Sequence, residues 1–130
     1  MVKKQKKVDE TQQLLDTIVF GMQEVKAHDI VVLDLRKIKN SIADYFVVCE
    51  GNSSTQVKAI EQSVDKFTSE VLNLDPVHVE GMKNGTWVLM DYFSVVVHIF
   101  EPKTRVYYDI EDLWADAEIA KVEEFIKLEK

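Results

Sequence analysis

Apolar residues recur at steps of three and four along two stretches of the chain, the spacing that places them on one face of a helix. The first stretch runs from about residue 9 to residue 27. The second begins at Ser53, where Ser53 and Gln56 form a capping-box pair, and it ends before Pro76. Both stretches are therefore predicted to be helices that bury one apolar face.

Shorter runs rich in β-branched residues and bounded by turn residues are typical of strands. They cover residues 30–35, 44–50, 77–80, 86–91 and 95–100. A last helix is predicted to begin with Asp109 as its cap. Its expected inward-facing residues are Ile110, Leu113, Trp114 and Ala117. This order predicts an α/β (α+β-like) fold, a mixed sheet of about five strands with helices mainly on one face.

The strands of residues 86–91 and 95–100 are predicted to form a hairpin whose two faces differ in chemistry. A two-residue turn at Tyr92-Phe93 would pair Asp91 with Ser94, Leu89 with Val96 and Trp87 with His98. One face is then aliphatic and suits a helix packed behind it. The other presents aromatic and aliphatic side chains, a histidine and an edge carboxylate. That second face is a binding platform if nothing in the chain covers it, and a second core layer otherwise.

The 130 residues suit one domain, because four glycines and two prolines leave little room for a flexible linker. We expect a disordered basic tip at residues 1–8, a folded domain at 9–118, and an acidic helical tail at 119–130. The formal net charge is -7, although four lysines lie within the first seven residues. An acidic body repels phosphate backbones and attracts basic partners. We therefore expect a basic protein as partner, with little direct RNA contact.

The single cysteine, Cys49, lies in an apolar run and is expected to be a buried strand thiol rather than a nucleophile. No apolar segment approaches the ~20 residues that span a bilayer, so a cytoplasmic location is expected. The histidines His28, His78 and His98 lie on separate elements, which disfavours a metal site. No cofactor is expected.

A glycine-serine turn at residues 51–54 could hold a phosphate at a helix start, as in metal-dependent nucleotidyltransferases. Those enzymes also place two carboxylates one residue apart on the next strand, where both can bind magnesium. Residues 77–80 and 86–91 offer one acid each, and no Walker loop or dinucleotide fingerprint is present. An enzyme of that class is therefore the second hypothesis, behind a binding protein.

Short motifs follow one another along residues 14–117 in a characteristic order. They include Asp29-Ile30, Ala43-Asp44-Tyr45-Phe46-Val47-Val48-Cys49, Gly51-Asn52-Ser53, Trp87-Val88-Leu89-Met90-Asp91-Tyr92, Val95-Val96-Val97-His98-Ile99-Phe100, Arg105, Tyr107-Tyr108 and Leu113-Trp114. This ordered set resembles the ribosomal silencing factor family, also called RsfS or Iojap-like. One departure is Phe93-Ser94, where the family usually has Gly-Asp, so the turn there is expected to be reshaped.

The resemblance implies a nucleotidyltransferase-like fold without the active carboxylates, and hence no enzyme activity. It implies binding to the large ribosomal subunit beside its conserved protein numbered fourteen (the uL14 family). Bound there, the protein would block joining of the small subunit and repress translation during starvation. The family also tends to form homodimers off the ribosome. A homodimeric scaffold without a ribosomal role is an alternative.

Matching the family's motifs to this chain also suggests which residues contact the partner. The expected contact residues are Trp87, Leu89, Asp91, Tyr92 and His98, with Glu80 at the edge. Trp87 is expected to be the anchor and Asp91 to pair with a partner cation. His98 is expected to donate a hydrogen bond or to stack. Tyr107 and Tyr108 either line the same region or fasten the last helix.

Overall fold

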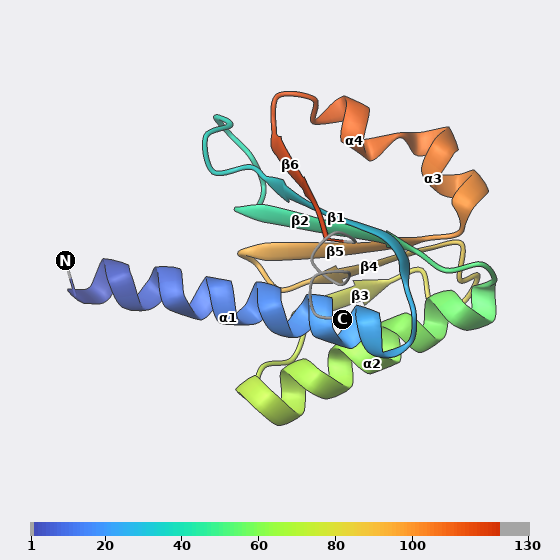
Figure 1. Cartoon of the computed structure of the whole chain (residues 1–130), viewed down its shortest axis with the longest axis horizontal. Helices are drawn as coiled ribbons and strands as arrows, with labels where there is room; N and C mark the ends of the chain where they lie inside the picture. Colours follow the sequence, from blue (N-terminus) through green and yellow to red (C-terminus); the bar gives the residue numbers. More distant parts are fainter. Residues whose placement is uncertain (1, 123–130) are drawn as a thin grey trace.

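The computed structural model describes residues 2–122 as one mixed sheet with helices on both faces (Figure 1). The helices are α1 (Val2–Glu24), α2 (Ser54–Leu72), α3 (Pro102–Tyr108) and α4 (Ile110–Leu113). The strands are β1 (His28–Asp34), β2 (Tyr45–Glu50), β3 (His78–Glu80), β4 (Trp87–Asp91), β5 (Val95–Phe100) and β6 (Glu118–Lys121). The strand order is β3-β4-β5-β2-β1-β6, in which β2 and β5 are parallel and all other neighbours are antiparallel. The predicted mixed α/β architecture is confirmed, with six strands where about five are expected.

The two long helices, α1 and α2, cover one face of the sheet, and the short helices α3 and α4 lie on the other (Figure 1). Each face carries its own apolar cluster. The cluster under α1 and α2 includes Ile18, Met22, Val57, Ile60, Val64, Val88, Met90, Val97 and Ile99. The cluster on the opposite face includes Leu33, Phe46, Val48, Val96, Phe100 and Ile110. Every residue of β5 is buried because this strand is covered from both sides.

Helix α2 confirms the start expected at residues 53–56. Ser53 Oγ accepts a hydrogen bond from the Gln56 amide at 3.1 Å, and the Gln56 side chain accepts one from the Asn52 amide at 2.7 Å. The helix ends where Asn73 adopts a left-handed conformation, with φ of 56°, and its amide donates to the Ser69 carbonyl. The glycine-serine turn is therefore a capped helix start.

The two ends of the chain differ from the expectations for them. Helix α1 begins at Val2, whereas a disordered tip is expected at residues 1–8; lysine and glutamine are good helix formers and extend a helix that is packed further along. Residues 119–121 of the expected helical tail belong instead to strand β6, which pairs with β1. This pairing removes the exposed edge that β1 would otherwise present. The rest of the expected tail, from residue 123 onward, lies outside the described residues.

The last helix is shorter than expected, and its cap differs. Asp109 has φ of 45° and makes no side-chain cap; its amide instead donates to the Arg105 carbonyl and closes α3. Leu113, expected to face inward, is 76% exposed. Ile110 is buried, and Trp114 and Ala117 are partly buried against the sheet.

The hairpin register expected for β4 and β5 is wrong by two residues, although the composition of each face is as expected. The observed pairs are Trp87 with Phe100, Leu89 with His98 and Asp91 with Val96. The expected turn at Tyr92-Phe93 is replaced by one at Phe93-Ser94, where the Tyr92 amide donates to the Val95 carbonyl at 2.9 Å and Phe93 has φ of 69°. A shift of two leaves every side chain on its original face, since the side-chain period of a strand is two residues.

Candidate partner-binding site

Strands β3 and β4 present an incompletely covered surface on the face of the sheet opposite α1 and α2. Glu80 lies directly across from Leu89, and Leu89 from His98, so these three side chains form a row across the strands. Trp87 and Asp91 lie on the same face, on either side of Leu89 along β4. We call Glu80, Trp87, Leu89 and Asp91 the platform. Glu80 is exposed and the other three are half-buried.

Trp87 is held from several sides. Its Nε1–H donates a hydrogen bond to Nδ1 of His98 over 3.1 Å. Its ring stacks on Phe100 with a centroid distance of 5.0 Å, and Tyr108 lies 4.7 Å away by the same measure. The indole is thus fixed in orientation yet keeps part of its surface open to solvent.

His98 is 4% exposed, so it lies beneath the platform and not in it. Burial lowers the pKa of His98 to about 4, which keeps the ring neutral at neutral pH. Because Nδ1 accepts from Trp87, the single ring proton belongs on Nε2. That nitrogen has no hydrogen-bond partner among the described residues. His98 therefore orients the Trp87 ring through this hydrogen bond. The buried His98 side chain is not placed to contact a partner directly.

Tyr92 lies on the other face of the sheet and is separated from the platform. It is 7% exposed, and its hydroxyl lies 2.8 Å from Oγ1 of Thr68 on α2. Burial raises the pKa of Tyr92 to about 12. Strand alternation alone predicts this placement, since Tyr92 is an even number of residues from Val88 and Met90 and so shares their face of the sheet. We leave Tyr92 out of the contact surface.

The remainder of the same sheet face, over β5, β2 and β1, is covered by the segment that follows β5. Ile110 is buried there, and the Trp114 ring lies edge-on to Phe46 at 5.6 Å. Of the two alternatives for this face, a second core layer holds for the inner strands. An open platform holds for β3 and β4, at the edge of the sheet.

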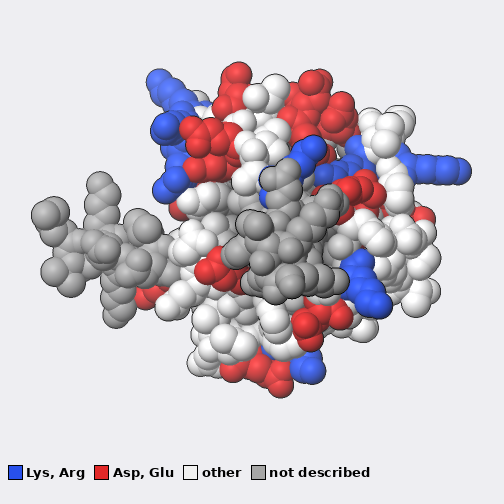
Figure 2. Space-filling view, viewed as in Figure 1, with Lys and Arg blue, Asp and Glu red and all other residues white. Residues whose placement is uncertain are grey.

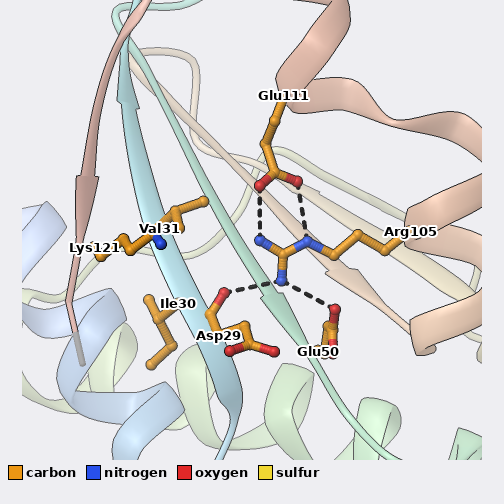
Figure 3. Close-up of a pocket in the computed structure, with 7 residues that line it drawn as sticks. All are labelled: Asp29, Ile30, Val31, Glu50, Arg105, Glu111 and Lys121. Atoms are coloured by element: carbon orange, nitrogen blue, oxygen red, sulfur yellow. Dashed lines mark hydrogen bonds and ion pairs between the residues drawn. The ribbon is translucent and has the colours of Figure 1, made fainter.

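Arg105 fastens the covering segment to the sheet (Figure 3). Its Nε and Nη2 donate to the two carboxylate oxygens of Glu111, both at 3.0 Å. Its Nη1 donates to the Asp29 carbonyl at 2.9 Å and to Glu50 Oε1 at 3.3 Å. These contacts join α3, α4, β1 and β2 at one point, beside a cavity of about 240 Å³.

Burial disfavours the charge on Arg105, but the Glu111 hydrogen bonds and the nearby carboxylates outweigh it and raise the Arg105 pKa. Burial also raises the pKa of Glu50, against the opposing effect of Arg105. Sequence reasoning assigns Arg105 no partner, because Asp29 and Glu50 are 76 and 55 residues away. No local spacing signals such a contact.

Acidic side chains dominate the area over α4 and the turn that follows it, at the upper edge of Figure 2. Among the described residues, no group of three or more histidine, cysteine, aspartate or glutamate side chains is arranged to hold a metal ion. None of the described helices has the length and apolar character needed to cross a membrane.

Comparison with known proteins gives consistent results for sequence and structure. Residues 8–130 match the family model described as ribosomal silencing factor during starvation. The ribosomal silencing factor RsfS of Halalkalibacterium halodurans is 38% identical over 112 residues, which cover 86% of this chain and 94% of that protein. A crystal structure of a Chromobacterium violaceum protein aligns with a TM-score of 0.76 and 38% identity, covering 80% of this chain and 85% of its own.

A more distant relative is the mouse protein named mitochondrial assembly of ribosomal large subunit protein 1. It is 30% identical over 102 residues, which cover 77% of this chain and 44% of the mouse protein. The match to the family model and the similarity to its members extend over most of the chain. The chain therefore belongs to the ribosomal silencing factor family.

Proposed function

We propose that this protein binds the large ribosomal subunit beside its protein numbered fourteen (the uL14 family) and thereby blocks association with the small subunit. Occupancy alone is sufficient, because two bodies cannot fill the same interface. The consequence is repression of translation during starvation. The observation that carries the proposal is the platform, a half-buried tryptophan and leucine flanked by two carboxylates at an open edge of the sheet.

Each platform residue has a distinct role in this proposal. Trp87 is the anchor, since large rigid aromatic side chains contribute much of the binding energy at protein interfaces. Leu89 extends the apolar contact. Asp91 and Glu80 pair with cations of the partner, and buried His98 positions the indole of Trp87. A basic ribosomal protein suits this surface better than bare RNA, given the net charge of -7.

The names of family members support a ribosomal partner. The matching family model is described as a ribosomal silencing factor. The mouse relative is named for assembly of the ribosomal large subunit. Both names concern the ribosome, and one of them specifies the large subunit.

We further propose that the fold is of the nucleotidyltransferase-like type and that the protein is nevertheless not an enzyme. In such enzymes the glycine-serine turn contacts a nucleotide. Here, Ser53 and the Asn52 amide are used in capping α2, and residues 77–80 and 86–91 contain one acidic residue each instead of the carboxylate pair that binds magnesium. We also place the protein in the cytoplasm, assign residues 9–118 to the family domain, and propose a homodimer off the ribosome.

Cosedimentation tests the proposal. Purified full-length protein is mixed with isolated large subunits or isolated small subunits and centrifuged through sucrose. We expect the protein to cosediment with large subunits and not with small subunits. We also expect it to lower the yield of joined ribosomes when small subunits are added to the large ones. Failure to travel with large subunits contradicts the proposal. A dimer that persists in the presence of excess large subunits would instead favour a homodimeric scaffold.

A further inference from the structure

A shallow groove lies next to the platform, between the start of β4 and helix α3. Its volume is about 590 Å³, and its lining residues are Thr86, Trp87, Lys103, Thr104, Tyr107 and Tyr108. Three of the six are aromatic and adjoin one another. The centroid of the Tyr108 ring is 4.7 Å from that of Trp87 and 4.9 Å from that of Tyr107. Tyr107 is 80% exposed, so its ring is available to a ligand.

The charge of this groove is opposite to that of the protein as a whole. Lys103 is the one charged residue among the six, and it forms no ion pair with the side chains described for residues 10–122. One further lysine, Lys58, lies near the groove without lining it, beside Gly85, the residue before Thr86. Lys58 lies against Gly85, and its Nζ donates to the Lys83 carbonyl at 3.4 Å.

The hollow around Arg105 differs in its charged groups, since the carboxylates of Asp29, Glu50 and Glu111 line it together with Arg105 and Lys121. The carboxylates nearest in sequence to α3, those of Glu101 and Asp109, flank the helix and do not line the groove. On a chain with 23 acidic and 16 basic residues, a hollow with a free lysine and no carboxylate favours an anionic ligand.

We propose that this groove binds one unpaired nucleotide of RNA, with its base against the aromatic rings and its phosphate at Lys103. Bases stack on aromatic side chains in single-stranded RNA sites, and lysine, threonine and tyrosine side chains bind phosphate oxygens. The inference rests on the proposed function and extends it. The platform contacts a basic ribosomal protein, and the adjoining groove contacts a nucleotide of the RNA beside it.

Trp87 lies at the boundary of the two surfaces, since it belongs to both the platform and the groove. Its indole N–H is already used by His98, so it offers only its ring to either partner. Lys103 repels an arginine or lysine side chain that would otherwise stack on the same rings. That repulsion is the reason to prefer a nucleotide over a cationic protein segment as the occupant.

An adenosine hexanucleotide is the probe for the first test. The full chain with Trp114→Phe leaves Trp87 as the one tryptophan, whose fluorescence reports on the groove. We expect saturable quenching by the hexanucleotide at low salt, and weaker quenching by adenosine monophosphate. Tyr107→Ala should weaken binding about tenfold through lost stacking. Lys103→Glu should weaken it about fivefold and lower the salt slope by about 0.7.

Lys66→Glu is the matched control, because Lys66 is an exposed lysine on α2, on the other face of the sheet. It makes the same change of net charge and should have a much smaller effect than Lys103→Glu. Equal effects of the two reversals, or no quenching by the hexanucleotide, would overturn the inference. So would tight binding of a triarginine peptide that Lys103→Glu strengthens, since the occupant would then be a cationic segment.

A second test uses large ribosomal subunits and separates this inference from the proposed function. Lys103→Glu should reduce cosedimentation about fivefold where Lys66→Glu does not. Cosedimentation that is unaffected by Lys103→Glu would overturn the groove's role and leave the proposed function intact. Binding of the hexanucleotide that depends on Lys103, without any cosedimentation, would support the groove and contradict the proposed function.

Discussion

The indole nitrogen of half-exposed Trp87 donates a hydrogen bond, 3.1 Å long, to a ring nitrogen of buried His98. The indole N–H is the only hydrogen-bond donor of a tryptophan side chain, and here it already has a partner within the protein. The platform therefore offers a partner the face and edge of the ring, held in one orientation. Protonation of His98 at Nδ1 would turn the acceptor into a donor and break the bond.

The first prediction concerns how stability depends on pH. The pKa of His98 is about 4 in the folded protein, below its ordinary value of 6.5. Between these values the unfolded chain binds a proton that the folded chain does not, so the free energy of unfolding falls as the pH drops from 6.5 to 4. We expect this group alone to lower it by about 3 kcal/mol.

His98→Gln provides the comparison, because glutamine can accept from Trp87 but does not titrate. Urea denaturation at pH 7 and at pH 4 should show a smaller loss of stability for the variant than for the wild type. Parallel losses in the two proteins would contradict the assignment of the buried neutral imidazole.

A second prediction separates the charge of Asp91 from its structural contact. Asp91 Oδ1 accepts the Phe93 amide at 2.8 Å, which supports the left-handed turn residue. Asp91→Asn keeps an oxygen for that bond and removes the charge. We expect the free energy of unfolding to change by less than about 0.5 kcal/mol. We also expect binding to large subunits to weaken about threefold to tenfold, with a smaller salt dependence.

Glu70→Gln on α2 is the matched control for Asp91, since it removes an exposed charge from the opposite face of the sheet. Cosedimentation at two salt concentrations distinguishes the two variants. Equal cosedimentation of the two variants at both salt concentrations would mean that the Asp91 carboxylate makes no specific contact with the partner.

The third prediction compares two arginines in different surroundings. The Arg105 side chain is 9% exposed and binds two carboxylates and a carbonyl, whereas Arg36 is 54% exposed and pairs with Asp34. Arg105→Ala leaves partly buried carboxylates unpaired and should lower the free energy of unfolding by about 3 kcal/mol. Arg36→Ala should cost less than about 1 kcal/mol. Guanidinium titration measures both, and similar costs would contradict the role given to Arg105.

The fourth prediction concerns the thiol of Cys49. It is fully buried in β2, and burial raises its pKa far above the ordinary range. We expect no rapid reaction with Ellman's reagent in the native protein at neutral pH, and immediate reaction once the protein is unfolded in urea. Rapid native reaction would show that the strand opens readily or that the thiol is accessible.

Elements governed by local patterns could be predicted from the sequence. The apolar steps and the Ser53–Gln56 pair determine α2, and runs of β-branched residues locate β1 to β5 to within about two residues. The two faces of the β4–β5 hairpin could also be predicted, because alternation survives a register error of two. The register itself depends on the turn, where Phe93 adopts a conformation for which its sequence gives no signal.

Contacts between distant segments could not be predicted in this way. Strand β6 forms because β1 has an open edge, a fact visible only once the sheet is assembled. The partners of Arg105 come from β1, β2 and α4. Helix α3 had one local signal that was missed, Pro102 at its first turn. Whether the platform is open depends on the path of the segment after Phe100. The burial of the platform residues could therefore be determined only from the structure.

The measurement that tests the central claim most directly is subunit joining, followed by light scattering, after large subunits are incubated with the protein. The wild type should block joining in proportion to the large subunits it occupies. Trp87→Ala should need about 30 times more protein for the same block, equivalent to about 2 kcal/mol. Tyr92→Phe, a change at a buried tyrosine on the other face, should block as the wild type does. A Trp87→Ala variant that blocks joining as well as the wild type would contradict the account.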